Sequence, residues 1–186
     1  MDNLHLVYAT DKNYLFPTNV SLSSAIMQAA HPERLRFHVL DCGVPDEMWK
    51  TWTRDLERHF PGVSISRHQV DVSRFAGCRT WRGGLSAYAR LCLPKLLPDI
   101  DWCVYADGDT LFVEDPWKLT ELFDDSIALW GWDQQTVGKE ANFFPHIRKS
   151  IMKWYADRDL QGDFSNYVCS GFLIFNLRWF RSNDAE

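Results

Sequence analysis

The chain has 186 residues, of which 46% are apolar and 24% are charged, and this length is enough to bury the core of one domain. These proportions are typical of a globular protein and exclude disorder, collagen-like sequence and coiled coil as the main architecture. The net charge of −5 is unfavourable for general nucleic-acid binding, which needs a basic surface.

The sequence contains no pattern typical of a membrane span or a signal peptide. No apolar run approaches the roughly 20 residues that cross a bilayer, and Met1–Asp11 lacks a basic region followed by an apolar one. We therefore expect a cytoplasmic protein without a transmembrane segment. Peripheral association with the inner face of a membrane, a homo-oligomer and a completing partner all stay open.

Five cysteines are spread widely along the chain, and none forms a Cys-x-x-Cys pair. An odd number at such spacing argues against a disulfide framework, and the histidines do not cluster with them as zinc ligands would. We expect buried, reduced thiols at Cys42, Cys78, Cys92, Cys103 and Cys169.

Apolar periodicity predicts strands that alternate with helices along the chain. The predicted strands are 4–10, 36–40, 63–68, 101–106, 126–132 and 170–177. The predicted helices are 17–30, 45–59, 85–97 and 146–157, and another helix starts before Glu186. This alternation indicates an α/β fold with a mostly parallel central sheet flanked by helices.

Two polar turns follow predicted strands, at Asp11–Tyr14 and Asp107–Asp109. Ligands of such sheets bind outside the carboxyl ends of the strands. Asp11 and Asn13 could bind the edge of a base and Tyr14 could stack on it, or the segment could simply be a capped turn before a helix. Both interpretations stay open on local grounds.

The second turn contains an Asp-x-Asp triplet. Chance predicts roughly two such triplets in a chain of this composition, and the sequence has three. Only Asp107-Gly108-Asp109 follows an apolar strand and precedes another apolar run. Carboxylates at this spacing can hold one Mg²⁺ or Mn²⁺ ion, which prefers oxygen ligands. Arg90, among apolar residues, needs an anionic partner, either an Asp or a bound phosphate.

Four segments occur in an order and spacing that resemble a known family: Val7–Tyr14, Phe37–Asp41, Ala87–Leu91 and Tyr105–Asp109. They look like family 8 glycosyltransferases, the group of bacterial lipopolysaccharide galactosyltransferases and glycogenin. The resemblance implies one GT-A domain (a Rossmann-like nucleotide-diphospho-sugar transferase fold) over residues 1–186. It also implies a UDP-sugar donor, Mn²⁺ or Mg²⁺, transfer of a hexose with retention, and a glycan or lipopolysaccharide acceptor.

The resemblance also implies roles at matching positions. Asp11 and Asn13 would contact uracil and Tyr14 would stack on it. Arg90 would lie near the sugar and phosphates, and Asp107 with Asp109 would bind the metal. The remaining implied residues are Ala9 and Gly108 at the donor, Ser170 and Gly171 on a loop lining the sugar pocket, and Arg82 and Asp133 toward the sugar or acceptor.

Three features depart from the family pattern. Cys169 stands where Asn is usual, and Arg82 stands near a position that is often His. The family's third metal ligand is a His in a His-x-x-Gly-x-x-Lys-Pro-Trp segment, which these residues do not contain; His146 lacks its flanking residues. The chain thus looks like the N-terminal two-thirds of a glycosyltransferase, and we expect weaker metal binding and impaired transfer by this chain alone.

Two other functions share part of this sequence pattern. A haloacid dehalogenase-type phosphatase also has Asp-x-Asp after a strand, but Thr110-Leu111 follows here instead of Gly-Thr, and about 100 residues precede the motif. A non-catalytic nucleotide-sugar or glycan-binding module, or a subunit completed by a partner, is the alternative from another class. Exposed apolar surface near Leu177 would favour this alternative, because such a surface needs a partner to cover it.

Overall fold

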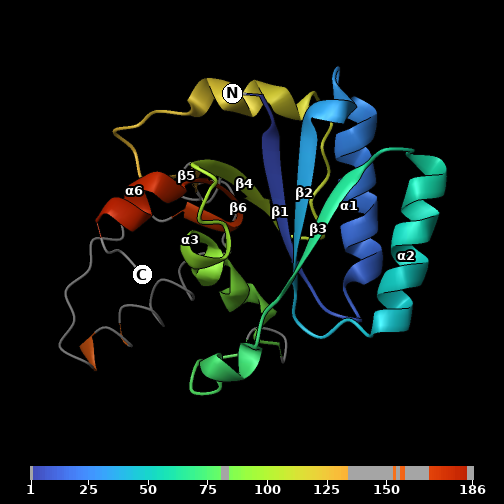
Figure 1. Cartoon of the computed structure of the whole chain (residues 1–186). Coiled ribbons are helices and arrows are strands. Elements are labelled where there is room, and N and C mark those ends of the chain that lie inside the picture. The colour runs from blue at the N-terminus through green and yellow to red at the C-terminus, as the bar shows by residue number, and fades with distance from the viewer. Residues whose placement is uncertain (1, 81–83, 134–152, 154–155, 158–167, 184–186) are drawn as a thin grey trace, which may run out of the picture. The chain divides into compact units, whose positions relative to one another are not determined.

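The structure is a computed structural model that describes residues 2–80, 84–133, 153, 156–157 and 168–183. The chain divides into a main unit, Met1–Trp130 with Gly171–Glu186, and a second unit, Gly131–Ser170. The main unit contains most of the sheet (Figure 1), and it contains every residue that lines the cavity described below. In the second unit, Lys153 donates to Asp157 at 2.9 Å.

A six-stranded sheet has the order β3-β2-β1-β4-β6-β5. Its strands are β1 Leu4–Thr10, β2 Leu35–Asp41, β3 Ser64–Gln69, β4 Trp102–Ala106, β5 Leu129–Asp133 and β6 Val168–Asn176. β1 pairs in parallel with both β2 and β4, and β2 pairs in parallel with β3. β4 pairs with β6 antiparallel. The predicted α/β fold with a mostly parallel sheet is confirmed.

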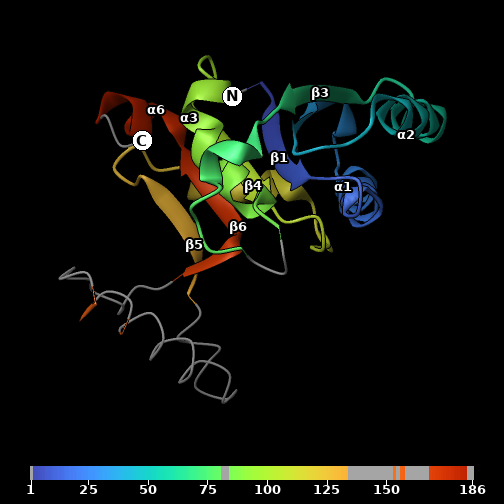
Figure 2. The same cartoon turned by 90° about the horizontal axis from the view of Figure 1, so that it is seen from below.

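The helices α1 (Leu15–Gln28) and α2 (Asp46–His59) lie on one face of strands β1–β3, as Figures 1 and 2 show. Alternate strand residues point to this face and form the core with Leu22 of α1, Trp52 and Leu56 of α2, and the 3₁₀ helix η4 (Pro116–Leu122). The strand residues of this core are Leu4, Leu6, Tyr8, Leu35, Phe37, Val39, Trp102, Val104, Ala106 and Ile174.

The other face of β4 and β6 is covered by shorter helices. These are the 3₁₀ helix η3 (Ser86–Cys92), α3 (Leu93–Leu96) and α6 (Leu177–Ser182). Tyr105 of β4 lies under the guanidinium of Arg90 from η3, and Phe175 of β6 contacts Phe180 of α6. Two further 3₁₀ helices, η1 (Pro32–Arg34) and η2 (Val72–Phe75), belong to connections.

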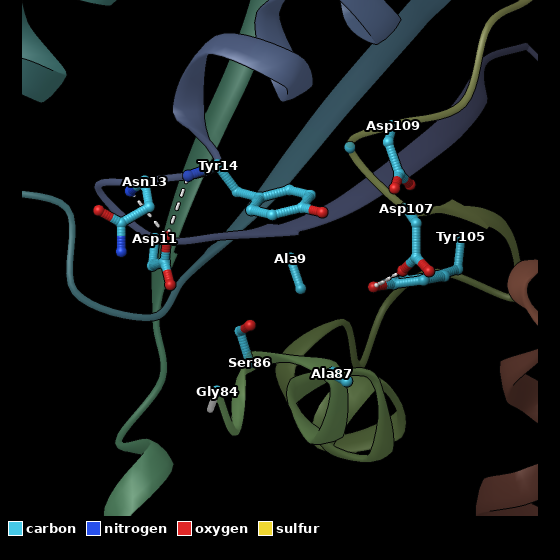
Figure 3. Close-up of a pocket in the computed structure, with 11 residues that line it drawn as sticks. Ala9, Asp11, Asn13, Tyr14, Gly84, Ser86, Ala87, Tyr105, Asp107 and Asp109 are labelled. Carbon is cyan, nitrogen blue, oxygen red and sulfur yellow. Dashed lines mark hydrogen bonds between the residues drawn. The ribbon is translucent and has the colours of Figure 1, made fainter. Parts of the chain in front are cut away.

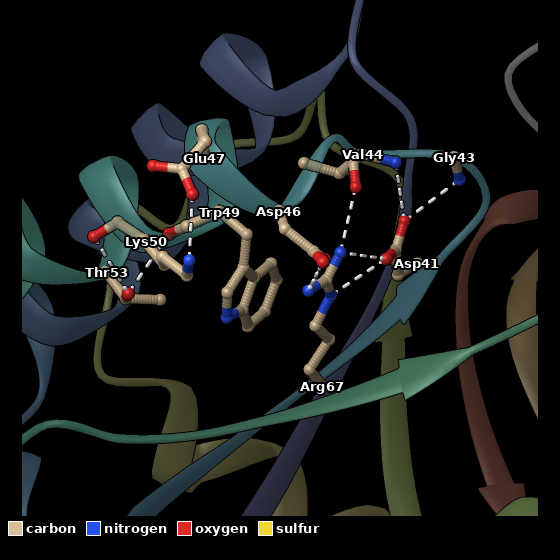
Figure 4. A network of polar contacts seen from close by, with 9 residues as sticks. All are labelled: Asp41, Gly43, Val44, Asp46, Glu47, Trp49, Lys50, Thr53 and Arg67. Atoms are coloured by element: carbon tan, nitrogen blue, oxygen red, sulfur yellow. Dashed lines mark hydrogen bonds and ion pairs between the residues drawn. The ribbon is translucent and has the colours of Figure 1, made fainter.

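A buried carboxylate fixes the turn that leads from β2 into α2 (Figure 4). Asp41 Oδ1 accepts hydrogen bonds from the backbone N–H groups of Gly43 and Val44, at 2.9 and 2.6 Å. Asp41 Oδ2 accepts from Arg67 Nε of β3 at 2.8 Å, and Arg67 also binds Asp46 at 2.7 Å. Gly43 has φ +119°, a conformation in which only glycine avoids strain.

Two predicted elements differ from the structure in type or by more than two residues at an end. The predicted helix 85–97 is a 3₁₀ helix followed by one α-turn, because Pro94 has no N–H to donate to Arg90 and its ring clashes with that carbonyl in an α-helix. The predicted strand 126–132 begins only at Leu129, because Asp124 accepts bonds from the N–H and hydroxyl of Ser126 and holds a turn there. Most of the predicted helix 146–157 falls outside the described residues.

The cysteines are free, as expected, but they are not all buried. Cys92 and Cys103 are buried and Cys42 and Cys169 are half-buried, whereas Cys78 is exposed. The expectation for Cys78 was wrong because the residue lies in a turn after η2, where its N–H donates to the carbonyl of Phe75. Within the described ranges, no helix is long and apolar enough to cross a bilayer.

Candidate functional site

A cavity of about 470 Å³ opens at the carboxyl ends of β1 and β4 (Figure 3). This is where the ligand site of a parallel sheet is expected. Three segments line it: the end of β1 with the turn that follows, the start of η3, and the end of β4 with the acidic turn. The lining residues are Ala9, Asp11, Asn13, Tyr14, Gly84, Ser86, Ala87, Tyr105, Asp107, Gly108 and Asp109.

The turn after β1 is capped by its own first side chain. Asp11 Oδ1 accepts hydrogen bonds from the N–H groups of Asn13 and Tyr14, at 2.8 and 3.0 Å. The capped-turn interpretation is therefore confirmed, and the same residues also line the cavity. The Tyr14 ring lies over the cavity, across from Ser86 (Figure 3), and it is 37% exposed, so an aromatic ligand can stack on it.

Asp107 is held at the other end of the cavity by two donors. Its Oδ1 accepts from Arg90 Nη2 at 3.0 Å and from the Tyr105 hydroxyl at 2.8 Å. Arg90 is 7% exposed, so an Asp is one anionic partner that its burial requires. Burial raises the pKa of Tyr105 far above its ordinary value. The hydroxyl therefore keeps its proton and donates a hydrogen bond to Asp107.

The acidic turn packs tightly against the beginning of α1. A Cβ atom on Gly108 would lie 2.5 Å from Thr18 Oγ1 and 3.2 Å from the Thr18 backbone nitrogen. Thr18 is itself buried, and its hydroxyl lies 2.8 Å from the carbonyl oxygen of Tyr14. The middle residue of the triplet is therefore glycine for a steric reason, and the close approach packs the acidic turn against the beginning of α1.

Asp107 and Asp109 are the donor set available to a metal. Both line the cavity (Figure 3), and carboxylate oxygens suit the hard cations Mg²⁺ and Mn²⁺, which accept water or phosphate oxygens at their remaining positions. The described residues contain no group of three or more His, Cys, Asp or Glu side chains placed to hold a metal. The acidic turn thus fits a divalent cation as a two-carboxylate site.

The other predicted site residues lie at different places relative to the cavity. Gly171 is brought to the site, because its carbonyl oxygen accepts a hydrogen bond from the Asp107 N–H at 2.7 Å. Gly171 and Ser170 lie within strand β6, so the expectation of a loop there was wrong. The Asp107–Gly171 bond continues the β4–β6 ladder one residue past the pair of Ala106 and Phe172. Asp133 ends β5. Arg82 lies outside the described residues.

Four lining residues had no role in the sequence analysis: Gly84, Ser86, Ala87 and Tyr105. Ala87 and Tyr105 lie in two of the segments that carry the family resemblance, Ala87–Leu91 and Tyr105–Asp109, but the resemblance implied no role for either residue. Gly84 and Ser86 carry no sequence signal that separates them from an ordinary helix start. Their importance follows only from the packing of η3 against β1.

Comparison with solved structures defines the class of fold. The galactosyltransferase LgtC, solved in complex with donor and acceptor sugar analogues, superposes with a TM-score of 0.73 and 25% identity, over 96% of this chain and 60% of that one. The fold is the GT-A fold of glycosyltransferases. The family described as "Glycosyl transferase family 8" matches residues 5–185, and the chain belongs to this family, as its motifs predict.

Two curated relatives are similar in sequence. Glucoside xylosyltransferase 2 of Mus musculus is 31% identical over 134 residues, which cover 65% of this chain and 28% of that protein. The probable galacturonosyltransferase-like 9 of Arabidopsis thaliana is 23% identical over 98% of this chain and 48% of its own length. The chain thus spans less than half the length of either curated relative.

Proposed function

We propose that this chain is the donor-binding part of a metal-dependent, retaining glycosyltransferase that moves a hexose from a UDP-sugar to a glycan or lipopolysaccharide acceptor. The observation that carries the proposal is the pair Asp107 and Asp109 at one end of a cavity whose other end holds the Tyr14 ring. A nucleoside diphosphate has the same polarity, with an aromatic base at one end and a charged diphosphate at the other.

Uracil binds at the Tyr14 end in this proposal. The Tyr14 ring stacks on the base, since aromatic faces stack on bases of any identity, and the turn of Asp11 and Asn13 supplies polar groups for its edge. Ala9 forms the floor between the two ends. A small side chain there leaves room for the ribose.

The diphosphate binds at the acidic end. Asp107 and Asp109 hold a divalent cation, whose chemistry when bound is to neutralise charge on the departing nucleotide. Arg90 adds a positive charge beside Asp107. Gly108 lets the backbone of the acidic turn pack against α1, so both carboxylates are oriented before the donor arrives.

The sugar and acceptor side rests on the family resemblance alone. We assign Ser170 and Gly171 to the donor sugar, and Asp133 and Arg82 to the sugar or acceptor. Arg82 and Cys169 replace residues usual in the galactosyltransferases of the family, so the transferred hexose need not be galactose. A lipopolysaccharide acceptor would place the reaction at the inner face of a membrane.

A second candidate function is a nucleotide-sugar-binding module completed by a partner or another segment. It is favoured by the metal site, where the described part of the chain contributes two carboxylates and no third ligand. Such a site binds UDP with the help of a metal but turns over slowly or not at all.

The test is a calorimetric titration of UDP into the chain, with and without Mn²⁺. We expect binding that requires Mn²⁺ and is weakened at least tenfold by Asp109→Ala. Asp99→Ala is the matched control, because Asp99 belongs to another Asp-x-Asp triplet, is exposed, precedes the start of β4 and does not line the cavity. Metal-independent binding, or equal loss in both variants, would contradict the proposed donor site.

Turnover separates the two candidates. Release of UDP from a UDP-hexose by the 186-residue chain, with formation of a glycoside of retained configuration, supports the enzyme. Metal-dependent UDP binding with no turnover supports the module.

A further inference from the structure

We propose that Tyr105 is a positioning residue for the acidic turn: its hydroxyl fixes the Asp107 carboxylate for metal binding while its ring supports Arg90. The inference rests on the proposed function, because it assigns a task to Tyr105 at the same donor site. Tyr105 is 1% exposed and lies on β4, two residues before Asp107, on the face of the sheet that η3 covers.

The first observation is that one carboxylate oxygen receives two donors from different elements. Asp107 Oδ1 accepts from the Tyr105 hydroxyl at 2.8 Å and from Arg90 Nη2 at 3.0 Å. A single donor would leave the carboxylate free to turn about that bond. Two donors from different directions fix its plane, and therefore fix where its second oxygen lies relative to Asp109.

The second observation is that the two donors are not equivalent. Arg90 is a cation beside the cavity, and a bound diphosphate competes with Asp107 for its guanidinium. The Tyr105 hydroxyl belongs to a buried ring on a strand and has no such second partner among the hydrogen bonds found for it. It therefore holds Asp107 in place when Arg90 shifts toward the donor phosphates.

The third observation links the ring itself to Arg90. The guanidinium carbon of Arg90 lies 4.2 Å from the centre of the Tyr105 ring, within the range of a cation–π contact. Ring and hydroxyl thus act on two different neighbours. Tyr105→Phe keeps the ring and its packing and removes only the bond to Asp107, so it isolates the positioning role.

The test measures UDP binding by wild type and Tyr105→Phe at several Mn²⁺ concentrations, and without metal. A hydrogen bond to a charged group contributes enough to shift an equilibrium by about tenfold or more. We expect Tyr105→Phe to need about ten times more Mn²⁺ for half-maximal UDP binding. Any weak metal-free UDP affinity should change less than twofold, which a structural defect would not allow.

Tyr8→Phe is the matched control. Tyr8 is equally buried, and its hydroxyl lies 3.3 Å from Ser21 Oγ on the opposite face of the sheet. Tyr8→Phe should leave the Mn²⁺ concentration for half-maximal UDP binding unchanged. Thermal unfolding of each variant checks that the fold is intact.

The outcomes separate the inference from the function on which it rests. An unchanged Mn²⁺ requirement in Tyr105→Phe would overturn the positioning role while leaving the donor site standing. Tyr105→Phe could instead lose UDP affinity equally with and without Mn²⁺ and unfold at a lower temperature. That result would overturn the positioning role in favour of a packing role. A wild-type chain that binds no UDP at any Mn²⁺ concentration would overturn the proposed function and, with it, this inference.

Discussion

Gly108 illustrates how a single residue decides the geometry of the site. The glycine lets the acidic turn approach Thr18 so closely that a Cβ atom would stand 2.5 Å from the Thr18 hydroxyl. Part of that contact is with the backbone of α1, which cannot move aside as a flexible side chain does. The spacing of Asp107 and Asp109 across the turn therefore depends on the absence of a side chain between them.

We predict that Gly108→Ala destabilises the chain by about 1–3 kcal/mol, the range for forced overpacking, and also weakens metal-dependent UDP binding. Urea unfolding and calorimetry measure the two effects. Gly77→Ala is the control, because a Cβ atom on Gly77 would meet nothing within 4 Å. If Gly108→Ala and Gly77→Ala change stability and UDP binding by the same small amount, the close packing of the acidic turn contributes to neither.

The Asp41–Arg67 ion pair joins β2 to β3 near the carboxyl ends of these two strands. Asp41 is buried, with 4% of its side chain exposed, whereas 20% of Arg67 is exposed. The pair connects both strands to the first turn of α2 through Val44 and Asp46 (Figure 4). Nearby on α2, Lys50 and Glu47 form a second pair at 2.8 Å that is exposed to solvent.

We predict different costs for removing the cation from these two pairs. Arg67→Met leaves the buried Asp41 carboxylate without its counter-charge and should lower the free energy of unfolding by about 2–4 kcal/mol. Lys50→Met should change it by less than about 0.5 kcal/mol, as exposed pairs contribute little. Chemical denaturation of both variants makes the comparison, and similar costs for the two would show that Asp41 does not depend on Arg67.

The pH dependence of folding is a property of the whole molecule, and a row of three histidines contributes to it. His5, His38 and His68 lie on adjacent strands, with His38 nitrogens 2.9 Å from His5 and 3.1 Å from His68. Each neutral ring can donate to one neighbour and accept from the next. Burial lowers all three pKa values, that of His38 to about 3 with added repulsion from its two neighbours.

The sign of the effect follows from these directions. The unfolded histidines take up protons near pH 6.5, whereas the folded ones do so only at lower pH. The stability that the neutral histidines contribute is therefore fully present above about pH 6.5, and it falls as the pH decreases toward their lowered pKa values. For His38 we predict a loss of about 1–2 kcal/mol between pH 6.5 and 5.

His38→Gln should flatten this acid-side slope, because the glutamine does not titrate. His31→Gln, at an exposed position outside the row, should keep the wild-type slope. Urea unfolding at a series of pH values between 5 and 7.5 gives both slopes. A wild-type slope in His38→Gln would rule out the histidine row as its source.

Most of the main unit's elements were predictable from local pattern. β1 has the predicted bounds, and β2, β3 and β4 differ from prediction by one residue at their ends, because apolar runs bounded by polar turns identify buried strands. The 3₁₀ form of η3 was not predicted, although the helix begins within one residue of its predicted start. Its sequence suits a helix, and only Pro94 and the packing of η3 against β1 decide that the backbone tightens into a 3₁₀ helix.

The sequence by itself determined the α/β fold, the family and the two turns at the ends of β1 and β4, because hydrophobic periodicity and short motifs are local properties of the chain. Only the tertiary structure decided which of these pieces meet. The bond from Tyr105 to Asp107, the contact of Gly108 with Thr18 and the bond from Asp107 to Gly171 depend on strand register and helix packing. These are set by many long-range contacts at once, so no single segment of the sequence encodes them.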